Sequence, residues 1–223
     1  MIVLALDTTG RRGSLALLRD GVLLETRWIE APDGFGARLF PEMREALARH
    51  SLAVDDIDGF AAAAGPGSFT GIRIGLTAIK ALAEVNGKQV TGVSNLEALA
   101  ALGQGPFRAA VMDARRGEVY AAVYDEAGRL VVDEVVTKWE TFLKLVESRD
   151  VCFTASSAAL FEEQGVAALP HGRARIVTSE PTAAAVARIA AQRFQADEGV
   201  DPDALDANYV RRPEAELNWK APA

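Results

Sequence analysis

The stretch Gly65-Pro66-Gly67-Ser68-Phe69-Thr70-Gly71-Ile72-Arg73-Ile74-Gly75 follows an apolar run at 59–64 and leads directly into a helical pattern. A strand that passes through a glycine-rich turn into a helix is typical of α/β folds. Unpaired N–H groups of such a loop and helix start favour phosphate or carboxylate. Two interpretations stand open: an anion cradle, or a turn that uses glycine for backbone freedom. The candidate cradle residues are Asp7, Thr8, Gly65, Gly67, Ser68 and Thr70.

This loop lacks the parts of known nucleotide and hydrolase motifs. No Lys-Ser/Thr pair follows its last glycine, and its glycine spacing misses the dinucleotide pattern by one residue. Pro66 and Thr70 stand where a serine-hydrolase elbow has glycines.

Composition narrows the function classes. The chain has 223 residues, of which 49% are hydrophobic, and a net charge of −7, so direct grip on a nucleic-acid backbone is not expected. Cys152 is the one cysteine and lies in an apolar run, which indicates a buried thiol in a reducing compartment. No segment has the ~20 apolar residues that span a bilayer. We expect a cytoplasmic protein without a membrane partner.

The pattern of the first half indicates strands and helices in alternation. The expected elements are an antiparallel meander at 2–6, 13–18 and 22–29, helices at 39–50 and 69–85, a strand at 89–93, and a helix from the capping box at 94–97 to 102. Glycines 71 and 75 inside a helix indicate that another backbone approaches closely. The stretch 103–106 is a predicted boundary between domains 1–103 and 104–223.

The second half repeats the opening theme. The expected elements are an apolar strand at 109–112 that ends in Asp113, a return strand at 119–124, a helix from a capping box at 137–140 to 147, a strand at 151–154 and a helix at 182–195. Strand, aspartate, turn and strand therefore occur once per half, which indicates an internal duplication. We expect two α/β domains with mixed sheets, the last segment packing back on the first.

Four stretches together resemble the TsaB (YeaZ-type) family over nearly the whole chain. They are Leu4-Ala5-Leu6-Asp7-Thr8-Thr9, the glycine loop, Asp113-Ala114-Arg115-Arg116-Gly117-Glu118-Val119-Tyr120 and Tyr209-Val210-Arg211-Arg212-Pro213. The resemblance implies the two-domain actin-like, sugar kinase and heat-shock ATPase (ASKHA) superfold with duplicated mixed-sheet domains. It also implies a non-catalytic scaffold that binds TsaD, the enzyme that transfers threonylcarbamoyl to the tRNA adenosine next to the anticodon.

The same resemblance sets the expected partners and cofactors. TsaD is the direct partner, the ATPase TsaE joins the complex, and tRNA is reached only through them. This chain requires no cofactor of its own, and ATP or ADP can lodge at the complex interface.

Residue types argue against catalysis by this chain. His50 and His171 lie far apart, and Phe35 stands where family members often have a histidine, so no metal ligand set is expected. One thiol and two isolated histidines assemble no protease site. Asp7 resembles the magnesium-orienting carboxylate of actin-like ATPases, or is a turn aspartate. The rival hypotheses are a stand-alone ATPase or small-molecule kinase and a homodimeric binding protein for an anionic metabolite.

The two N-terminal helices are the predicted partner-binding surface. The resemblance implies that they pack with the equivalent helices of TsaD as a four-helix bundle, and without TsaD the same face can form a two-fold homodimer. The alternative is that their apolar stripes cover this protein's own sheet. The candidate residues are Leu39, Phe40, Met43, Leu47, Gly71, Ile72, Arg73, Gly75, Leu76 and Ile79.

Overall fold

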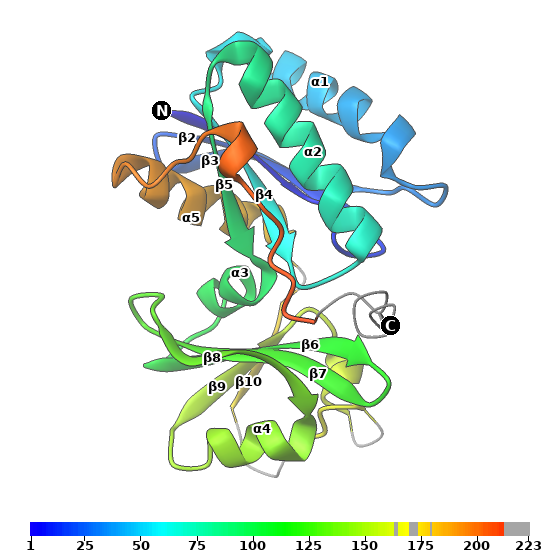
Figure 1. Cartoon of the computed structure of the whole chain (residues 1–223), viewed down its shortest axis with the longest axis vertical. Helices are drawn as coiled ribbons and strands as arrows, with labels where there is room; N and C mark the ends of the chain where they lie inside the picture. The colour runs from blue at the N-terminus through cyan, green and yellow to red at the C-terminus, as the bar shows by residue number, and fades with distance from the viewer. Residues whose placement is uncertain (163–164, 170–173, 179, 212–223) are drawn as a thin grey trace, which may run out of the picture.

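Two mixed sheets stacked end to end form the frame of the molecule (Figure 1). The computed structural model describes residues 1–162, 165–169, 174–178 and 180–211. The first sheet contains β1 (Ile2–Asp7), β2 (Gly13–Arg19), β3 (Val22–Ile29), β4 (Gly59–Gly65) and β5 (Gln89–Ser94). The second contains β6 (Phe107–Arg115), β7 (Glu118–Asp125), β8 (Leu130–Lys138), β9 (Val151–Ala155) and β10 (Arg175–Val177).

The two sheets repeat one topology. The first has the order β3-β2-β1-β4-β5 and the second the order β8-β7-β6-β9-β10. In each, the first three strands of the half pair antiparallel, and its fourth and fifth strands continue parallel to the first. This repeat confirms the internal duplication and the α/β class with mixed sheets.

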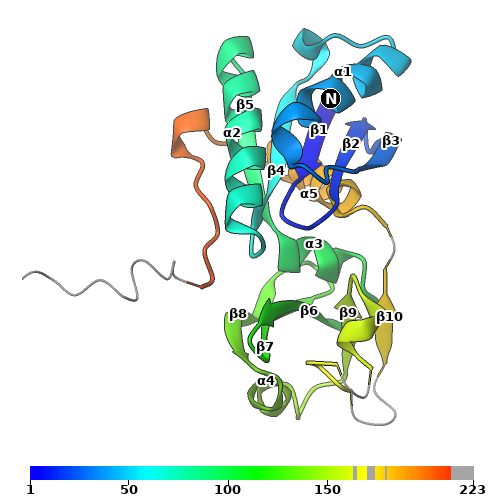
Figure 2. The same ribbon diagram turned by 90° about the vertical axis from the view of Figure 1, so that its right-hand side faces the viewer.

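Helices cover both faces of each sheet. They are α1 (Leu39–Arg49), α2 (Phe69–Asn86), α3 (Asn95–Ala101), α4 (Trp139–Leu145) and α5 (Thr182–Gln195). In the first half, α1 and α2 lie on one face and α5 on the other (Figure 2). In the second half, α4 covers one face and α3 the other.

The first strand shows why both faces of the first sheet must be covered. Leu4 and Leu6 point into the core under α1 and α2, whereas Val3 and Ala5 point into the core under α5. Successive side chains of a strand face opposite sides, so a run that is apolar throughout needs a layer on each side. All of these side chains are fully buried.

The last helix of each half packs on the sheet of the other half. Helix α3 follows β5 in the chain but packs on β6 and β7, and α5 follows β10 but packs on β1, β2 and β4. Ser14 Oγ on β2 accepts a hydrogen bond from the Ala183 backbone N–H, 3.1 Å away. It thereby satisfies one of the N–H groups in the first turn of α5, which have no partner within the helix. Each half therefore contributes one helix to the sheet of the other half. The expected division at 103–106 into domains 1–103 and 104–223 stays a prediction.

Two parts of the second half differ from the sequence-based expectation. Strand β8 and the three-residue β10 were not expected, although both complete the duplicated strand order. The capping box predicted at Thr137 is wrong: Thr137 belongs to β8, and Lys138 at the N-cap of α4 makes no side-chain cap bond. The chain stays extended there because β8 pairs with β7 up to Lys138.

Candidate functional site

The glycine loop forms a packed turn against β1 rather than standing alone. Asp7 Oδ1 accepts hydrogen bonds from the Thr9 backbone N–H, 2.8 Å away, and from Thr9 Oγ1, 2.7 Å away. Thr9 Oγ1 in turn accepts from Asn95 Nδ2 at 2.7 Å, and Asn95 Oδ1 accepts from the Gly65 N–H at 3.1 Å. Asp7 is 7% exposed and makes the hydrogen bonds of a turn aspartate. Sequence reasoning placed Asn95 only in a helix cap and missed this link.

Several glycines of the loop are needed because the chain itself fills the space beside them. A Cβ on Gly67 would lie 2.7 Å from Thr9 Cβ, and one on Gly71 would lie 2.0 Å from the Thr8 carbonyl oxygen. Gly65, with φ +112°, is approached by the Asn208 carbonyl oxygen. Thr8 Oγ1 also donates to the Gly71 carbonyl at 2.6 Å. The close backbone approach expected from Gly71 is confirmed, and these contacts favour the turn interpretation of the loop.

Ser68 and Thr70 occupy the first turn of α2. Ser68 Oγ accepts a hydrogen bond from the Gly71 N–H at 3.2 Å and is the N-cap of the helix. Gly87 ends the helix in the left-handed conformation with φ 60°. Thr70 is exposed and faces the groove between α1 and α2.

A cleft of about 890 Å³ lies between the two halves. Thr9, Gly67 and Ser68 line it from the first half, and Asp113 and Tyr120 line it from the second. Asp113 ends the main part of β6 as Asp7 ends β1, and its Oδ1 accepts from the Arg115 N–H at 2.7 Å. The two duplicated turns therefore face the same cleft with the same local hydrogen bond.

The predicted docking residues of α1 and α2 divide into core and surface. Most are core: Leu39, Met43, Leu47, Ile72, Leu76 and Ile79 are between 0% and 7% exposed, and Gly71 and Gly75 are also buried. Phe40 is 50% exposed and Arg73 is exposed. The stripes thus cover this protein's own sheet, while residues beside the stripes form the outer face.

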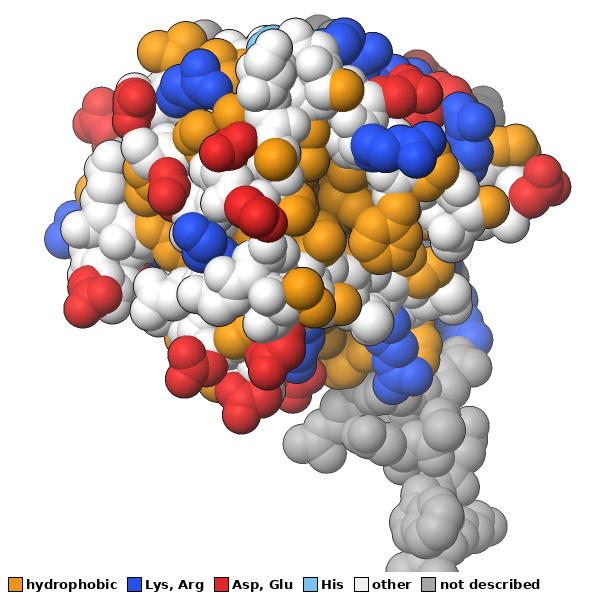
Figure 3. All heavy atoms as spheres, turned by 90° about the horizontal axis from the view of Figure 1, so that it is seen from above, with side chains coloured by type: hydrophobic (Ala, Val, Ile, Leu, Met, Phe, Trp, Pro, Cys, Tyr) orange, Lys and Arg blue, Asp and Glu red, His pale blue; other side chains and the backbone are white. Residues whose placement is uncertain are grey.

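That outer face contains an apolar hollow of about 470 Å³ between α1 and α2. Figure 3 shows hydrophobic side chains gathered around a hollow on the face seen from above. We call it the α1/α2 groove; it is lined by Gly36, Leu39, Phe40, Phe69, Thr70, Arg73, Ile74, Thr77, Ala78 and Ala81. Phe69, which was not among the predicted docking residues, is 41% exposed there.

A second apolar hollow, of about 340 Å³, continues the groove along α1. Phe40 lines both hollows, and Arg44, Leu52 and Leu82 line the second. Val85, near the end of α2, is 85% exposed. Exposed apolar side chains that form a contiguous strip mark interaction sites more often than scattered ones do.

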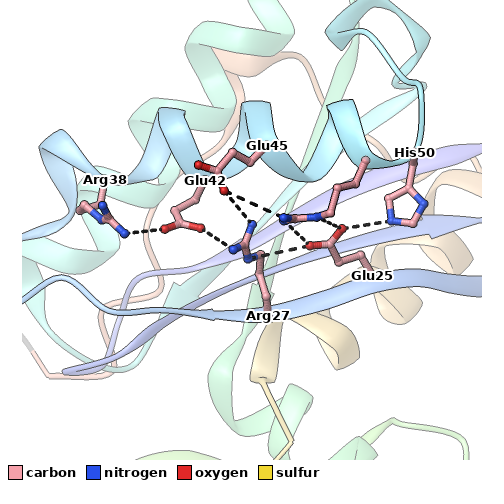
Figure 4. Close-up of polar contacts among 7 residues, drawn as sticks. Glu25, Arg27, Arg38, Glu42, Glu45 and His50 are labelled. Atoms are coloured by element: carbon pink, nitrogen blue, oxygen red, sulfur yellow. Dashed lines mark hydrogen bonds and ion pairs between the residues drawn. The ribbon is translucent and has the colours of Figure 1, made fainter.

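Ion pairs hold α1 to the edge strand β3 on the side away from α2 (Figure 4). Glu25 accepts from Arg49 Nη2 at 2.8 Å and lies 3.0 Å from His50 Nε2. Arg27 Nη2 lies 3.1 Å from Glu42 Oε2. Burial alone would raise the pKa of Glu25, but the hydrogen bonds and charges of Arg49, His50 and Arg27 outweigh it and lower that pKa below its ordinary value.

The spacing of charged residues in the sequence is consistent with this network, although no motif marks it. Glu25 and Arg27 are two apart on one strand and therefore share a face, and Glu45 and Arg49, four apart on α1, form an ion pair at 4.0 Å. Arg38 adds a 2.9 Å pair with Glu42. The network fixes the position of α1 and hence the shape of the groove.

The segment 205–211, which we call the strap, crosses from the first half to the second on the α2 side (Figure 1). The Asn208 N–H donates to the Ala64 carbonyl at 2.8 Å, and Asn208 Nδ2 donates to Glu134 Oε2 of β8 at 2.7 Å. Arg211 bonds to the Ala114 carbonyl at 2.9 Å and to Glu118. Arg212 and Pro213 of the closing motif, and His171, lie outside the described residues.

The described residues offer neither a metal-binding cluster nor a membrane-spanning helix. Within the ranges that the structure describes, no group of three or more His, Cys, Asp or Glu side chains is arranged to hold a metal ion. Over the same residues, no helix is long and apolar enough to cross a membrane.

Comparison with known proteins gives consistent matches. Residues 30–219 match the family model described as TsaD, tRNA N6-adenosine threonylcarbamoyltransferase. The tRNA threonylcarbamoyladenosine biosynthesis protein TsaB of Bacillus subtilis is 29% identical over 230 residues, with 98% of each chain covered. The protein of the same name from Escherichia coli is 36% identical over 137 residues, which cover 57% of this chain and 58% of the relative.

Solved structures give the same grouping. YeaZ from Pseudomonas aeruginosa superposes with a TM-score of 0.76 at 27% identity, covering 93% of this chain and 99% of its own. An activator of 2-hydroxyisocaproyl-CoA dehydratase from Clostridium difficile, solved with bound ADPNP, has a TM-score of 0.55 at 12% identity and covers 89% and 97%. The second likeness concerns the fold alone, and together they confirm the expected ASKHA superfold.

Proposed function

This chain belongs to the TsaD family, in its TsaB (YeaZ) group, and we propose that it is a non-catalytic subunit that binds a TsaD enzyme. The family takes part in the threonylcarbamoyladenosine modification of tRNA. In this proposal TsaD carries the transfer to adenosine, and the present chain supplies a surface rather than a reacting group. TsaE joins the complex through the pair, tRNA contacts this chain only indirectly, and the complex works in the cytoplasm.

The α1/α2 groove is the observation that carries this proposal. Phe40 and Phe69 stand at its opposite walls, 50% and 41% exposed, beside a hollow of about 470 Å³. Two helices side by side present ridges and grooves that a second pair of helices can fill, as in a four-helix bundle. Burying two aromatic side chains that are half exposed in the free subunit would supply a large part of the binding energy.

The contribution to rate follows from linkage. A subunit that binds only the active arrangement of an enzyme raises the population of that arrangement by its differential affinity. The rigid support of the groove suits this role, because α1 is held by the ion pairs of Glu25 and Arg27 and α2 by the close packing of Gly71 on Thr8. Without TsaD, the same face would associate with a second copy.

The test is a matched pair of charge substitutions. Phe40→Glu places a carboxylate in the groove. The control, Leu130→Glu, places one on β8, outside the groove, at a side chain of similar exposure: Leu130 is 51% exposed and Phe40 is 50% exposed. Binding to TsaD of the same organism is measured by light scattering after size exclusion, with tRNA modification assayed in each mixture. We expect complex and activity with wild type and Leu130→Glu and loss of both with Phe40→Glu.

Retained complex formation by folded Phe40→Glu would contradict the docking face, and failure of the wild-type chain to bind TsaD would contradict the proposed role. The alternative of a stand-alone ATPase or kinase makes a different forecast. It requires ATP turnover by the purified chain that Asp7→Ala abolishes.

A further inference from the structure

One rim of the α1/α2 groove is built from residues far apart in the chain. Tyr209 of the strap stacks on Phe69 of α2, with ring centroids 5.2 Å apart and an interplanar angle of 26°. Arg73, one turn further along α2, donates from Nε to the Tyr209 hydroxyl at 3.2 Å. Its guanidinium carbon lies 3.9 Å from the centroid of the Phe69 ring. The guanidinium is therefore held by a hydrogen bond and by an aromatic face.

Among the described residues, no carboxylate lies within 4.0 Å of Arg73, and its two outer nitrogens, Nη1 and Nη2, make no hydrogen bond. This is not for want of acidic residues, because the chain has 31 acidic and 24 basic residues. Arg73 also lines the apolar groove, so a partner docked there would exclude water from its guanidinium and strengthen its charge interactions.

We propose that Phe69, Arg73 and Tyr209 form an anchor for a carboxylate of the docked protein partner. The two Nη atoms of Arg73 match an aspartate or glutamate side chain bidentately, a geometry that lysine cannot reproduce. Phe69 and Tyr209 hold the fork in place before binding, so that less side-chain entropy is lost on docking. The inference rests on the proposed function and deepens it: the docking surface includes the strap, and its partner presents an acidic residue beside an apolar helix pair.

Strap attachment supports the placement of Tyr209. Lys80 Nζ donates to the Leu205 carbonyl at 2.9 Å, and Leu205 is 9% exposed in the core under α2. Asn208 is fixed between Ala64 and Glu134. Tyr209 is thus positioned by the contacts of Leu205 and Asn208 before it and by the hydrogen bond of Arg211 to the Ala114 carbonyl after it, and acts as a positioning residue for Arg73.

The experiment is a calorimetric titration of the full chain into TsaD of the same organism, with and without ATP, at 50 and 300 mM NaCl. Arg73→Met removes the charge, Arg73→Lys keeps it without the fork, and Tyr209→Phe keeps the stacked ring without the hydroxyl. Arg188→Met is the matched control, because Arg188 is an exposed arginine on α5, on the opposite face of the first sheet. Thermal unfolding of each variant checks its fold.

We expect Arg73→Met to weaken binding about 10- to 100-fold, Arg73→Lys about 10-fold and Tyr209→Phe about 3-fold, with Arg188→Met within about 2-fold of wild type. Salt should weaken wild-type binding more steeply than binding of Arg73→Met. A further variant of this chain, Arg73→Glu, should bind TsaD weakly. Replacing the TsaD carboxylate that pairs with Arg73 by lysine should restore its binding.

Three results would overturn the anchor while leaving the proposed function intact. They are equal affinity of Arg73→Met and wild type, an equal loss in Arg188→Met, and a loss that occurs only when ATP is present, which would assign Arg73 to a phosphate. Absence of wild-type binding is a different result, because it would remove the proposed function together with the anchor.

Discussion

The two halves of the molecule share a strand order and differ in what connects the last two strands of each sheet. Between β4 and β5 the first half carries α2, an 18-residue helix, whereas between β9 and β10 the described residues of the second half form a single 3-10 turn at Ala158–Leu160. Within the part of the chain that the structure describes, two long helices therefore lie side by side only in the first half. A duplicated sheet can keep its topology while one copy gains an outer surface that the other lacks.

The halves also share a turn but bury it differently. Asp7 and Asp113 each accept a hydrogen bond from the backbone N–H two residues on. Asp7 is 7% exposed under the loop before α2, whereas the Asp113 side chain is 42% exposed. The same local bond is thus part of a buried network in one half and a surface turn in the other.

The largest effect should come from filling the contact between the first turn and α2. Gly71→Ala places a Cβ 2.0 Å from the Thr8 carbonyl oxygen, a backbone atom that cannot move without shifting β1. We expect a loss of about 3 kcal/mol or more in the free energy of unfolding, measured by urea denaturation. Gly36→Ala is the control, because no described atom lies within 4 Å of its Cβ, and it should stay within about 0.5 kcal/mol. Equal stability of the two variants would contradict the packing.

A smaller effect should distinguish the duplicated turns. Asp7→Ala removes the one oxygen, Asp7 Oδ1, that accepts hydrogen bonds from both the backbone N–H and the hydroxyl of Thr9 in a buried site. It should cost about 1–3 kcal/mol, because a buried donor left without a partner cannot replace the lost bond with one to water. Asp113→Ala should cost less than about 0.5 kcal/mol, since water can replace the exposed carboxylate. Guanidinium denaturation of both variants compares them directly, and similar losses would show that burial does not separate the turns.

The smallest effect concerns two carboxylates whose pKa values shift in opposite directions. The pKa of Glu25 on β3 lies below its ordinary value of 4.5, so its contribution is present above that pH and is lost as pH falls through the folded-state pKa. Burial raises the pKa of Glu97 on α3, despite its 2.7 Å pair with Arg193 on α5. As pH falls, the folded state therefore binds a proton at Glu97 before the unfolded state does. The contribution of Glu97 to the free energy of unfolding thus grows as pH falls toward 4.5.

Unfolding free energies of wild type, Glu25→Gln and Glu97→Gln between pH 7 and pH 3 check these signs. The advantage of wild type over Glu25→Gln should shrink below pH 4.5, and its advantage over Glu97→Gln should grow as pH falls toward 4.5. Parallel curves for all three proteins would contradict both assignments.

Local patterns predicted the long elements well. Apolar spacing located α1, α2 and α5 to within a residue or two, and the close approach at Gly71 followed from a glycine inside a helix. Strand β8 was not predicted, because its apolar and polar side chains do not alternate: Asp133 and Glu134 stand together between pairs of valines. Three residues, as in β10, are too few for any periodicity to register.

The sequence by itself determined the α/β class, the duplicated strand-turn-strand units and the family, because periodicity, turn residues and motifs are local properties of the chain. Only the tertiary structure decided which residues are surface. Leu39 and Phe40 are apolar neighbours on one helix, yet they are 1% and 50% exposed, because the position of α1 on the sheet sets which side is covered. The pairing of Arg73 with Tyr209, 136 residues apart, likewise has no local signal, since it exists only after the strap has docked on α2.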